Sequence, residues 1–378
     1  MKTIGIDANV LTRMHRTGTE RYVSALLRHM QQVVLQADER VILYVSKPVS
    51  ELSTLPPGWE ERVLSWGLKK GWTHVRLSFE LRRNPPDIFF SPAHEIPLFA
   101  PRISTLATIH DVAFHALPEL YSKRMAWRHA WSLRRQIRRS THLLTVSEAT
   151  RQDVHTFAHV PLENMTVTPL AVDEVVFALT PYPVNLEPAP HGAVQGGETP
   201  PVRSYFIYIG RLEKKKNTAF LIDAFSQYAK TGEGDLVLGG SFGFGREEIE
   251  AAIARSGVKD RIHVLGFVPD ADLPSLMAGA KAFVFPTLYE GFGMPVLEAM
   301  TVGTPVIASD ISIMHEVLHD AALYADPRNE QAWASNMHDV DHRRDDLIAK
   351  GQEQVKKFSW GRTAEKTWEA IRQILWTT

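Results

Sequence analysis

Short runs rich in β-branched and aromatic residues alternate with longer runs of helical periodicity along most of this 378-residue chain. The first helical run, 19–34, repeats its apolar residues three and four positions apart, as an amphipathic helix does. Strands that alternate with helices predict a parallel sheet covered by helices on both faces. The strand candidates of this first series are TIGIDANV (3–10), VILYV (41–45), IFFS (88–91), STLATIH (104–110) and HLLTVS (142–147).

The alternation stops between residues 180 and 203, where the chain is rich in Pro and Gly and lacks periodicity, which is typical of a linker. A second α/β series follows, and the total length fits two domains of ~150 residues each. We therefore expect two doubly wound, Rossmann-like domains facing across a cleft, at 1–179 and 204–357, with a final helix in 358–378. The second series has strand candidates at 205–210, 235–240, 262–266, 282–286 and 305–309, and helices at 217–230, 246–256, 295–302 and 360–375.

The composition limits the class of protein. With 44% hydrophobic and 22% charged residues, the chain resembles an ordinary soluble protein, and its formal net charge of −1 gives no overall attraction to nucleic acid. The absence of cysteine excludes disulfides, zinc-thiolate sites and thiol nucleophiles. Neither a signal peptide nor a run of ~20 apolar residues is visible. We expect a cytoplasmic protein.

The segment YEGFGMPVLEAM (289–300) follows a strand and opens a helix, and ligands of doubly wound sheets bind beyond the carboxyl ends of the strands. Its glycines allow close approach of the backbone, whose amides can point at a diphosphate or a sugar hydroxyl. Glu290 and Glu298 suit vicinal hydroxyls, and Pro295 places Glu298 just inside the helix. The alternative for Glu298 is a carboxylate that only stabilises the helix dipole.

The segment IGRLEKKKN (209–217) also follows a strand and precedes a helix. Arg211 and Lys216 would flank the helix N-terminus, where free amides favour anions, and an Arg and a Lys together suit a phosphate. The alternative is a lysine-rich turn in solvent. This segment and the glutamate segment lie in the same half of the chain at equivalent strand ends, which favours a shared anion site.

Three further segments lie at predicted strand ends. His110 in ATIHDVAF (107–114) can hydrogen-bond a sugar hydroxyl, with Asp111 orienting it, although such a pair is often structural. Gly18, between the first strand and the first helix, suits either a phosphate or a simple turn. GGSFGFG (239–245) is equally ambiguous.

Two segments have a functional and a structural interpretation. His338 and His342 lie one helical turn apart, a spacing that can bind a metal, but their polar context favours an exposed helix face. Segment 123–139 is a basic amphipathic helix with Trp127 and Trp131. Such a helix suits either an anionic membrane or a packed position with a solvated basic side.

Some enzyme classes lack their motifs here. The chain has no G-x-x-x-x-G-K-[ST] and no G-x-G-x-x-G that opens a first helix. These absences disfavour a nicotinamide dehydrogenase.

Taken together, the motifs resemble the group 1 (family four) retaining glycosyltransferases of the GT-B fold, which have two Rossmann-like domains. The likeness covers nearly the whole chain except the linker. It rests on TIHDV, TVSEAT, GRLEKKKN, AFVFPTLYEGFGMPVLEAM with its E-x7-E spacing, and GTPVIASD, in the family's order. GIDANVLTRMHRTGTERYVSALL, SPAH and FSWGRTAEKTW further resemble bacterial mannosyltransferases that build O-antigen-type polysaccharides.

The resemblance implies roles for residues of the second domain. Arg211 and Lys216 would hold the donor diphosphate, and Glu298 would bind the ribose hydroxyls. Glu290 would face the donor sugar, assisted by the amides of Gly291, Phe292 and Gly293. The segment of Phe267 and Val268 would meet the base.

For the first domain, the resemblance implies that His110 lies near the reacting sugar and Gly18 near the phosphate or the acceptor. The final helix, from about residue 360, would cross back onto this domain. One departure is that loop 239–245 lacks the basic residue that the family often has there, so more of the phosphate charge would rest on Arg211 and Lys216.

The implied reaction is retaining hexosyl transfer, with mannose from GDP-mannose as the expected donor and a glycan or lipid-linked acceptor. No cofactor or metal is expected, because the two basic residues would replace the metal ion. No second carboxylate is placed to attack the sugar, so we favour a front-face route. The rival functions are a sugar-nucleotide 2-epimerase of the same fold and a non-catalytic, two-lobed sugar-binding protein.

Overall fold

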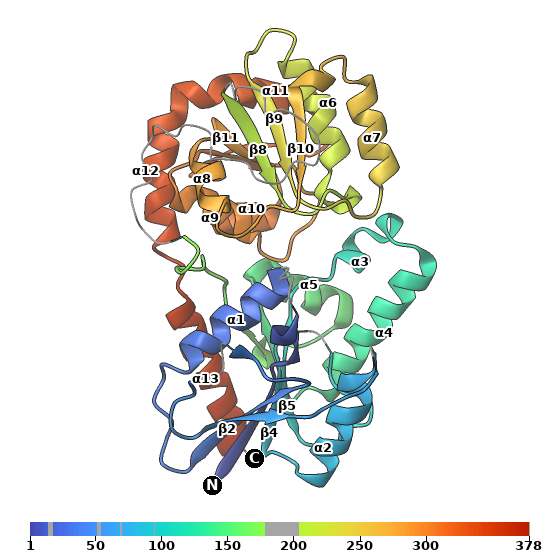
Figure 1. Ribbon diagram of the computed structural model, residues 1–378, viewed down its shortest axis with the longest axis vertical. Helices are drawn as coiled ribbons and strands as arrows, with labels where there is room; N and C mark the ends of the chain where they lie inside the picture. Colours follow the sequence, from blue (N-terminus) through green and yellow to red (C-terminus); the bar gives the residue numbers. More distant parts are fainter. Residues whose placement is uncertain (14–17, 51–53, 69, 94, 178–203, 378) are drawn as a thin grey trace. The chain divides into compact units, whose positions relative to one another are not determined.

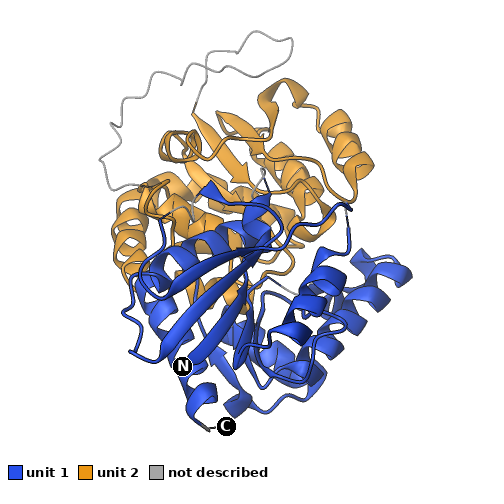
Figure 2. Ribbon diagram, turned by 60° about the horizontal axis from the view of Figure 1, so that its bottom comes forward, with its two compact units in different colours: residues 1–170, 359–378 blue, residues 171–358 orange. Residues whose placement is uncertain are grey.

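The structure is a computed structural model, and it describes residues 1–13, 18–50, 54–68, 70–93, 95–177 and 204–377. The chain forms two compact units, shown in different colours in Figure 2: unit 1 is 1–170 with 359–378, and unit 2 is 171–358. Unit 2 begins at Ala171, whereas the predicted first domain extends to residue 179. The predicted linker, 180–203, lies outside the described residues.

Unit 1 is built on a seven-stranded sheet in the order β3-β2-β1-β4-β5-β6-β7, with every neighbouring pair parallel (Figure 1). The predicted parallel sheet is thus confirmed. The strands are β1 (Lys2–Asp7), β2 (Glu39–Val45), β3 (Trp59–Val63), β4 (Ile88–Ser91), β5 (Ser104–Ile109), β6 (His142–Thr145) and β7 (Met165–Val167). The α-helices are α1 (Gly18–Met30), α2 (Ser78–Arg83), α3 (Ala113–Ala116), α4 (Lys123–Arg139), α5 (Glu148–Ala158) and α13 (Trp360–Thr377). The short ones are η1 (Asn9–Thr12), η3 (Trp72–Leu77), η4 (Pro118–Leu120) and η5 (Leu162–Asn164).

Unit 2 has a six-stranded parallel sheet in the order β10-β9-β8-β11-β12-β13. Its strands are β8 (Tyr205–Ile209), β9 (Asp235–Gly239), β10 (Ile262–Gly266), β11 (Ala282–Phe285), β12 (Val306–Ser309) and β13 (Ala322–Ala325). Its helices are α6 (Thr218–Tyr228), α7 (Arg246–Arg255), α8 (Leu273–Ala278), α9 (Met294–Thr301), α10 (Ser312–Leu318), α11 (Glu330–Asp339) and α12 (Arg344–Val355). Short helices are η6 (Lys214–Lys216), η7 (Lys259–Arg261) and η8 (Val340–Arg343). In both units the order doubles back on the first strand, which is the doubly wound arrangement.

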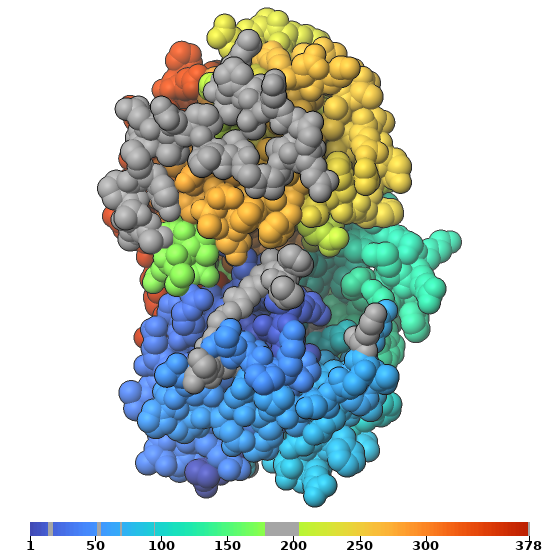
Figure 3. Space-filling model, viewed as in Figure 1, coloured from blue at the N-terminus to red at the C-terminus, as the bar shows by residue number. Residues whose placement is uncertain are grey.

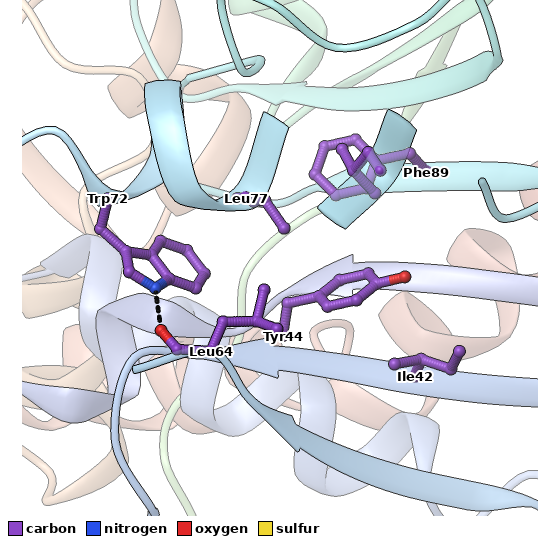
Figure 4. Close-up of a cluster of buried hydrophobic side chains, with 7 residues drawn as sticks. Ile42, Tyr44, Leu64, Trp72, Leu77 and Phe89 are labelled. Carbon is purple, nitrogen blue, oxygen red and sulfur yellow. Dashed lines mark hydrogen bonds between the residues drawn. The ribbon is translucent and has the colours of Figure 1, made fainter. Parts of the chain in front are cut away.

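Buried aromatic and aliphatic side chains hold the outer strands of unit 1 to the helices beside them. Figure 4 shows one such cluster, in which the Trp72 ring packs on strand β2 and its Nε1 donates to the Leu64 carbonyl at 2.8 Å. A buried Trp needs this partner, because an unsatisfied indole N–H would cost about 1–3 kcal/mol. The cluster contains Ile42, Tyr44, Leu64, Trp72, Leu77, Leu81 and Phe89.

The final helix α13 belongs to unit 1, although it follows unit 2 in the sequence. Trp368 is 1% exposed, and its Nε1 donates to the Met30 carbonyl at the end of α1 at 3.1 Å. Arg372 donates to both oxygens of buried Glu39, at 2.9 and 2.8 Å. Burial acts to raise the pKa of Glu39, but the bonds from Arg372 and the Gln36 amide outweigh it and leave that pKa below its usual value. These contacts fasten the C-terminal helix to unit 1.

Candidate active site

The carboxyl ends of β8, β9 and β10 meet in a surface made of glycine backbone. The Gly210 amide donates to the Gly239 carbonyl at 2.9 Å, and the Gly240 amide donates to the Gly266 carbonyl at 2.6 Å. A Cβ on Gly240 would lie 1.8 Å from the Gly210 oxygen, and its φ of +144° also disfavours a side chain. Only glycine fits there, so the ends of these strands pack backbone against backbone at this edge of the sheet.

Arg211 begins the turn after β8. Its carbonyl accepts the Tyr208 hydroxyl at 3.0 Å, which fixes the backbone, whereas its side chain is 65% exposed and lies 3.8 Å from the Glu213 carboxylate. Burial raises the pKa of Tyr208 well above its usual value, so this hydroxyl stays a donor. Arg211 is thus an exposed guanidinium on a fixed turn, available to an anion at the strand edge.

Lys216 points inward at the end of the same turn. Its ammonium forms an ion pair with Glu290 and lies 5.4 Å from the centre of the Phe285 ring. The two side chains are 17% and 9% exposed, and Thr287 Oγ1 donates to the same Glu290 oxygen at 3.0 Å. The basic and glutamate segments, 74 residues apart, therefore meet in one partly buried polar cluster. A solvated turn does not describe Lys216.

Lys214 shows what a solvated lysine of this turn looks like. It pairs with Glu248, whose side chain is 57% exposed, and its own side chain is 30% exposed. Loop 239–245 supports the turn: the Gly243 amide donates to Leu212 O at 2.8 Å, and Lys214 N donates to Phe244 O at 3.0 Å. The sequence left the role of this loop open, and in the structure it braces the turn that carries Arg211 and Lys216.

The E-x7-E segment runs from the end of β11 into α9. Gly293 has a φ of +97°, and a Cβ there would lie 2.8 Å from the Met314 methyl carbon. Gly291 is buried, and Phe292 is 3% exposed with its ring edge-on to Phe358 at 5.6 Å. The glycines turn the backbone tightly while Phe292 anchors it in the core.

Glu298 lies in the second turn of α9 and is 1% exposed. The first turn of α9 contains Pro295, as predicted, and no acidic residue. A carboxylate that serves only the helix dipole would lie in the first turn, near solvent. The position of Glu298 therefore argues against the capping alternative.

Phe267 and Val268 follow β10 at the same edge of unit 2. The Phe267 ring is 59% exposed, an unusual position for a large aromatic side chain. Val268 packs against the glycine surface: a Cβ on Gly239 would lie 3.0 Å from the Val268 methyl. An exposed ring beside bare backbone can stack on a planar ligand such as a nucleobase.

In unit 1, His110 lies at the end of β5. Its Nε2 lies 2.8 Å from the Pro92 carbonyl, which only accepts, so Nε2 carries a proton and donates to that carbonyl. The Tyr22 ring packs edge-on at 4.7 Å and holds the imidazole orientation. Asp111 Oδ1 accepts the Ala113 amide at 3.2 Å and so caps α3. An orienting role for Asp111 toward His110 stays a prediction.

Gly18 is the exposed first residue of α1, and the residues before it lie outside the described part of the chain. Its contact with a phosphate or an acceptor stays a prediction.

Asp7, at the end of β1, is a candidate that our sequence interpretation missed. It is 7% exposed, and burial raises its pKa to about 7. The Asn9 amide, 3.0 Å from Oδ1, opposes this shift; Glu95 adds to it. A carboxyl that titrates near neutrality at a strand end is a typical feature of functional sites. The available signal was its position as the last residue of the first strand.

No group of three His, Cys, Asp or Glu within the described ranges could hold a metal ion. His338 instead packs its ring on Tyr228 at 4.6 Å, with Nε2 3.3 Å from the Thr231 hydroxyl. Across the same ranges, no helix combines the length and apolarity that crossing a bilayer requires.

Two doubly wound sheets, with glycine loops and paired charged groups at a strand edge, fit the GT-B fold of glycosyltransferases. Sequence profiles agree: one described as "Glycosyl transferases group 1" matches residues 196–354, and one described as "Glycosyltransferase Family 4" matches 16–175. The chain belongs to this glycosyltransferase family.

Individual relatives support the same assignment. The chain is 30% identical to the O-antigen chain mannosyltransferase B of Escherichia coli over 79% of this chain and 77% of that protein. It is 26% identical to the O-antigen chain mannosyltransferase RfbU of Salmonella typhimurium over 79% and 76%. The fold is similar to sucrose-phosphate synthase from Thermosynechococcus elongatus, with a TM-score of 0.74, 16% identity and full coverage of both chains.

Proposed function

We propose that this glycosyltransferase moves mannose from GDP-mannose to a glycan or lipid-linked acceptor, with retention of the anomeric configuration and without a metal ion. The observation that carries the proposal is the Lys216–Glu290 cluster beside Arg211 at the glycine-lined edge of unit 2. The mannose assignment comes from the names of the two bacterial relatives.

The central chemical problem is the negative charge that develops on the departing nucleoside diphosphate. Arg211 offers a planar guanidinium that can bind two phosphate oxygens, and Lys216 adds a charge held in place by Glu290 and the Phe285 ring. Preorganised groups of this kind stabilise a transition state by about 2.7–4 kcal/mol each, which corresponds to about 10²–10³ in rate. Two such side chains can therefore replace a metal ion.

Glu290 and Glu298 suit different parts of the donor. Glu290 lies with Lys216 at the strand edge, where a carboxylate can accept hydrogen bonds from the hydroxyls of the sugar. Glu298 lies deeper, in α9, and suits the ribose. Phe267 suits the base, which would stack on its exposed ring.

For the transfer step, we favour a front-face route in which the leaving phosphate takes the proton of the acceptor hydroxyl as the new bond forms. The negative charge on the leaving group supports this route, as do the two cations, Arg211 and Lys216, that would keep that group close. His110, held through Nε2 by the Pro92 carbonyl, would lie near the reacting sugar and hydrogen-bond one of its hydroxyls.

The test is thermal unfolding with GDP, UDP, ADP and their mannose, glucose and N-acetylglucosamine conjugates. A ligand at ~100 times its Kd adds about 2.7 kcal/mol of stability. We expect the midpoint to rise with GDP and GDP-mannose, and a rise with uridine nucleotides instead would refute the mannose donor. Lys214→Ala should keep the rise and Lys216→Ala should lose most of it.

Incubation of the protein with the donor that raises the unfolding midpoint, without an acceptor, distinguishes a glycosyltransferase from a 2-epimerase. A 2-epimerase would convert the nucleotide sugar alone, whereas the transferase should leave it intact or hydrolyse it slowly. Transfer to a mannose-containing acceptor with an α-linked product from an α-linked donor would support retention. A β-linked product would refute it.

A further inference from the structure

Helix α4 presents a face of arginine and tryptophan to solvent. It lies at the right-hand edge of unit 1 in Figure 1, and its residues, coloured teal, reach the surface in the view of Figure 3. Trp127 is 69% exposed and Trp131 is 45% exposed. At 100° per residue the two rings lie on one side of the helix. The exposed basic residues that share this side are Arg124, Arg128, Arg134 and Arg138.

The opposite side of α4 holds the helix rigidly. Leu133 and Gln136 are buried, and Gln136 Nε2 donates to the Thr108 carbonyl in β5 at 3.3 Å. Arg135 reaches the Pro97 carbonyl at 2.8 Å, and Arg139 reaches the Ala100 carbonyl at 2.9 Å. These two arginines are structural, so the outward face is presented on a fixed support.

Helix α4 carries basic residues and no acidic ones. Its 17 residues contain one lysine, six arginines and no aspartate or glutamate. The chain as a whole carries −1, so the rest of it carries −8, the difference between −1 and +7. Other helices of this chain are neutralised along their own surface. Lys350 pairs with Asp346 in α12 at 3.0 Å, and Arg246 pairs with Glu250 in α7 at 2.7 Å.

Helix stability does not explain this pattern. Cations at the N-terminal turn, here Lys123 and Arg124, oppose the helix dipole, and like charges four positions apart repel. Two exposed tryptophans also leave apolar surface in water that burial elsewhere would remove. The combination of Trp and Arg on one face matches the interfacial region of a bilayer, where an indole lies among the headgroups and a guanidinium binds phosphate.

We propose that the outer face of α4 docks on the surface of an anionic lipid bilayer, with the helix parallel to the membrane plane. Trp127 and Trp131 would enter the headgroup region, and the four exposed arginines would bind lipid phosphates. Charge complementarity selects this occupant, since a neutral partner would leave four like charges buried without counter-charges. The proposal stands independently of the donor and acceptor assigned above.

The test is cosedimentation of the full-length protein with sucrose-loaded vesicles. We use vesicles of phosphatidylcholine alone and of phosphatidylcholine with 30% phosphatidylglycerol, at about 0.1 M salt. A Lys or Arg near an anionic surface contributes about a five-fold factor in partitioning. We expect binding to the anionic vesicles only, and a marked loss at about 1 M salt, where the Debye length falls to about 3 Å.

Two variants carry the test. Arg128→Gln/Arg134→Gln/Arg138→Gln should lower the partition coefficient about 10²-fold, from three factors of about five. Its matched control, Lys259→Gln/Lys356→Gln/Lys357→Gln, removes three exposed cations from unit 2 and should bind like wild type. All six side chains are exposed, so both proteins should fold, which circular dichroism checks.

Trp127→Ala/Trp131→Ala should also weaken binding to the anionic vesicles. Brominated lipids in these vesicles should quench the tryptophan fluorescence of the wild-type protein, and this double variant should lose most of that quenching. Trp376→Ala, another exposed tryptophan of unit 1, should not.

Three results would overturn the proposal. The first is equal binding of wild type to neutral and anionic vesicles. The second is unchanged binding of the triple-arginine variant. The third is a loss of oligomers in the tryptophan variant by light scattering, with no loss of vesicle binding, which would make the face an interface between copies.

Discussion

The replacement Lys216→Ala tests the cluster at the strand edge of unit 2 directly. It leaves the Glu290 carboxylate, 9% exposed, without its ammonium partner. Breaking a buried ion pair by removing one partner typically costs about 3–5 kcal/mol, because the remaining charge stays desolvated. Lys216 itself is 17% exposed, and Thr287 Oγ1 still donates to Glu290, so we expect the lower end, about 3 kcal/mol.

A loss of this size lowers the unfolding midpoint by about 6–12 °C, since 1 kcal/mol corresponds to about 2–4 °C for a domain of this length. Calorimetry is the appropriate assay, because it separates the transitions of two units if they unfold independently. The same variant should reduce kcat/KM for transfer by about 10²–10³, through loss of a cation at the diphosphate.

The matched control is Lys214→Ala in the same turn. Its ion pair with Glu248 is largely exposed, and such pairs contribute about 0–1 kcal/mol, so its midpoint should fall by less than about 4 °C. A second variant, Lys216→Ala/Glu290→Gln, also removes the unpaired Glu290 carboxylate. It should recover at least half of the unfolding free energy lost in Lys216→Ala, while its activity stays low. The reasoning would be refuted by equal midpoints and equal rates for Lys216→Ala and Lys214→Ala.

Three further predictions address other parts of the structure. Asp7→Asn should leave stability unchanged near pH 4 and raise the unfolding midpoint at pH 8. The pKa of Asp7 is about 7 in the folded protein and 3.8 in the unfolded chain. The free energy of unfolding of the wild-type protein therefore falls as the pH rises from 3.8 to 7, by about 4 kcal/mol in total, and Asn avoids this loss. A gain in midpoint that is the same at both pH values would contradict this. Glu298→Gln should weaken nucleoside diphosphate binding about ten-fold or more in calorimetric titration, since a hydrogen bond to a charged group contributes about 1.5–3 kcal/mol. An unchanged Kd would mean that the role of Glu298 is structural. Gly240→Ala should lower the midpoint by at least about 5 °C, because a Cβ would lie 1.8 Å from the Gly210 oxygen. Gly67→Ala is the control and should leave the midpoint unchanged, because no atom lies within 4 Å of a Cβ there. Similar midpoints for the two variants would show that the strand ends can separate.

The sequence by itself determined the layered α/β fold. Period-two and period-3.6 patterns are local, so they placed most of the predicted strands and helices within about two residues of where they lie. The first strand and the first helix were predicted three and four residues too long at their ends, and strands β3, β7 and β13 were missed. The strand 262–266 was predicted with its final bounds, and helix 295–302 was displaced by one residue from Met294–Thr301. Glycine-rich loops at strand ends also identified the edge of unit 2 that carries Arg211 and Glu290, because ligand edges follow from sheet topology.

Only the tertiary structure decided which side chains of these segments act together. Nothing local distinguishes Lys216 from Lys214, yet Lys216 pairs with the largely enclosed Glu290 and Lys214 with the exposed Glu248. Burial raises the pKa of Asp7, and burial depends on strands and loops far away in the sequence. The same holds for α4. The helical periodicity of its sequence indicated an amphipathic helix, but only the structure shows that Arg135 and Arg139 bind backbone carbonyls of the same unit. Pairing and desolvation are properties of neighbours in space, and neighbours are set by the fold.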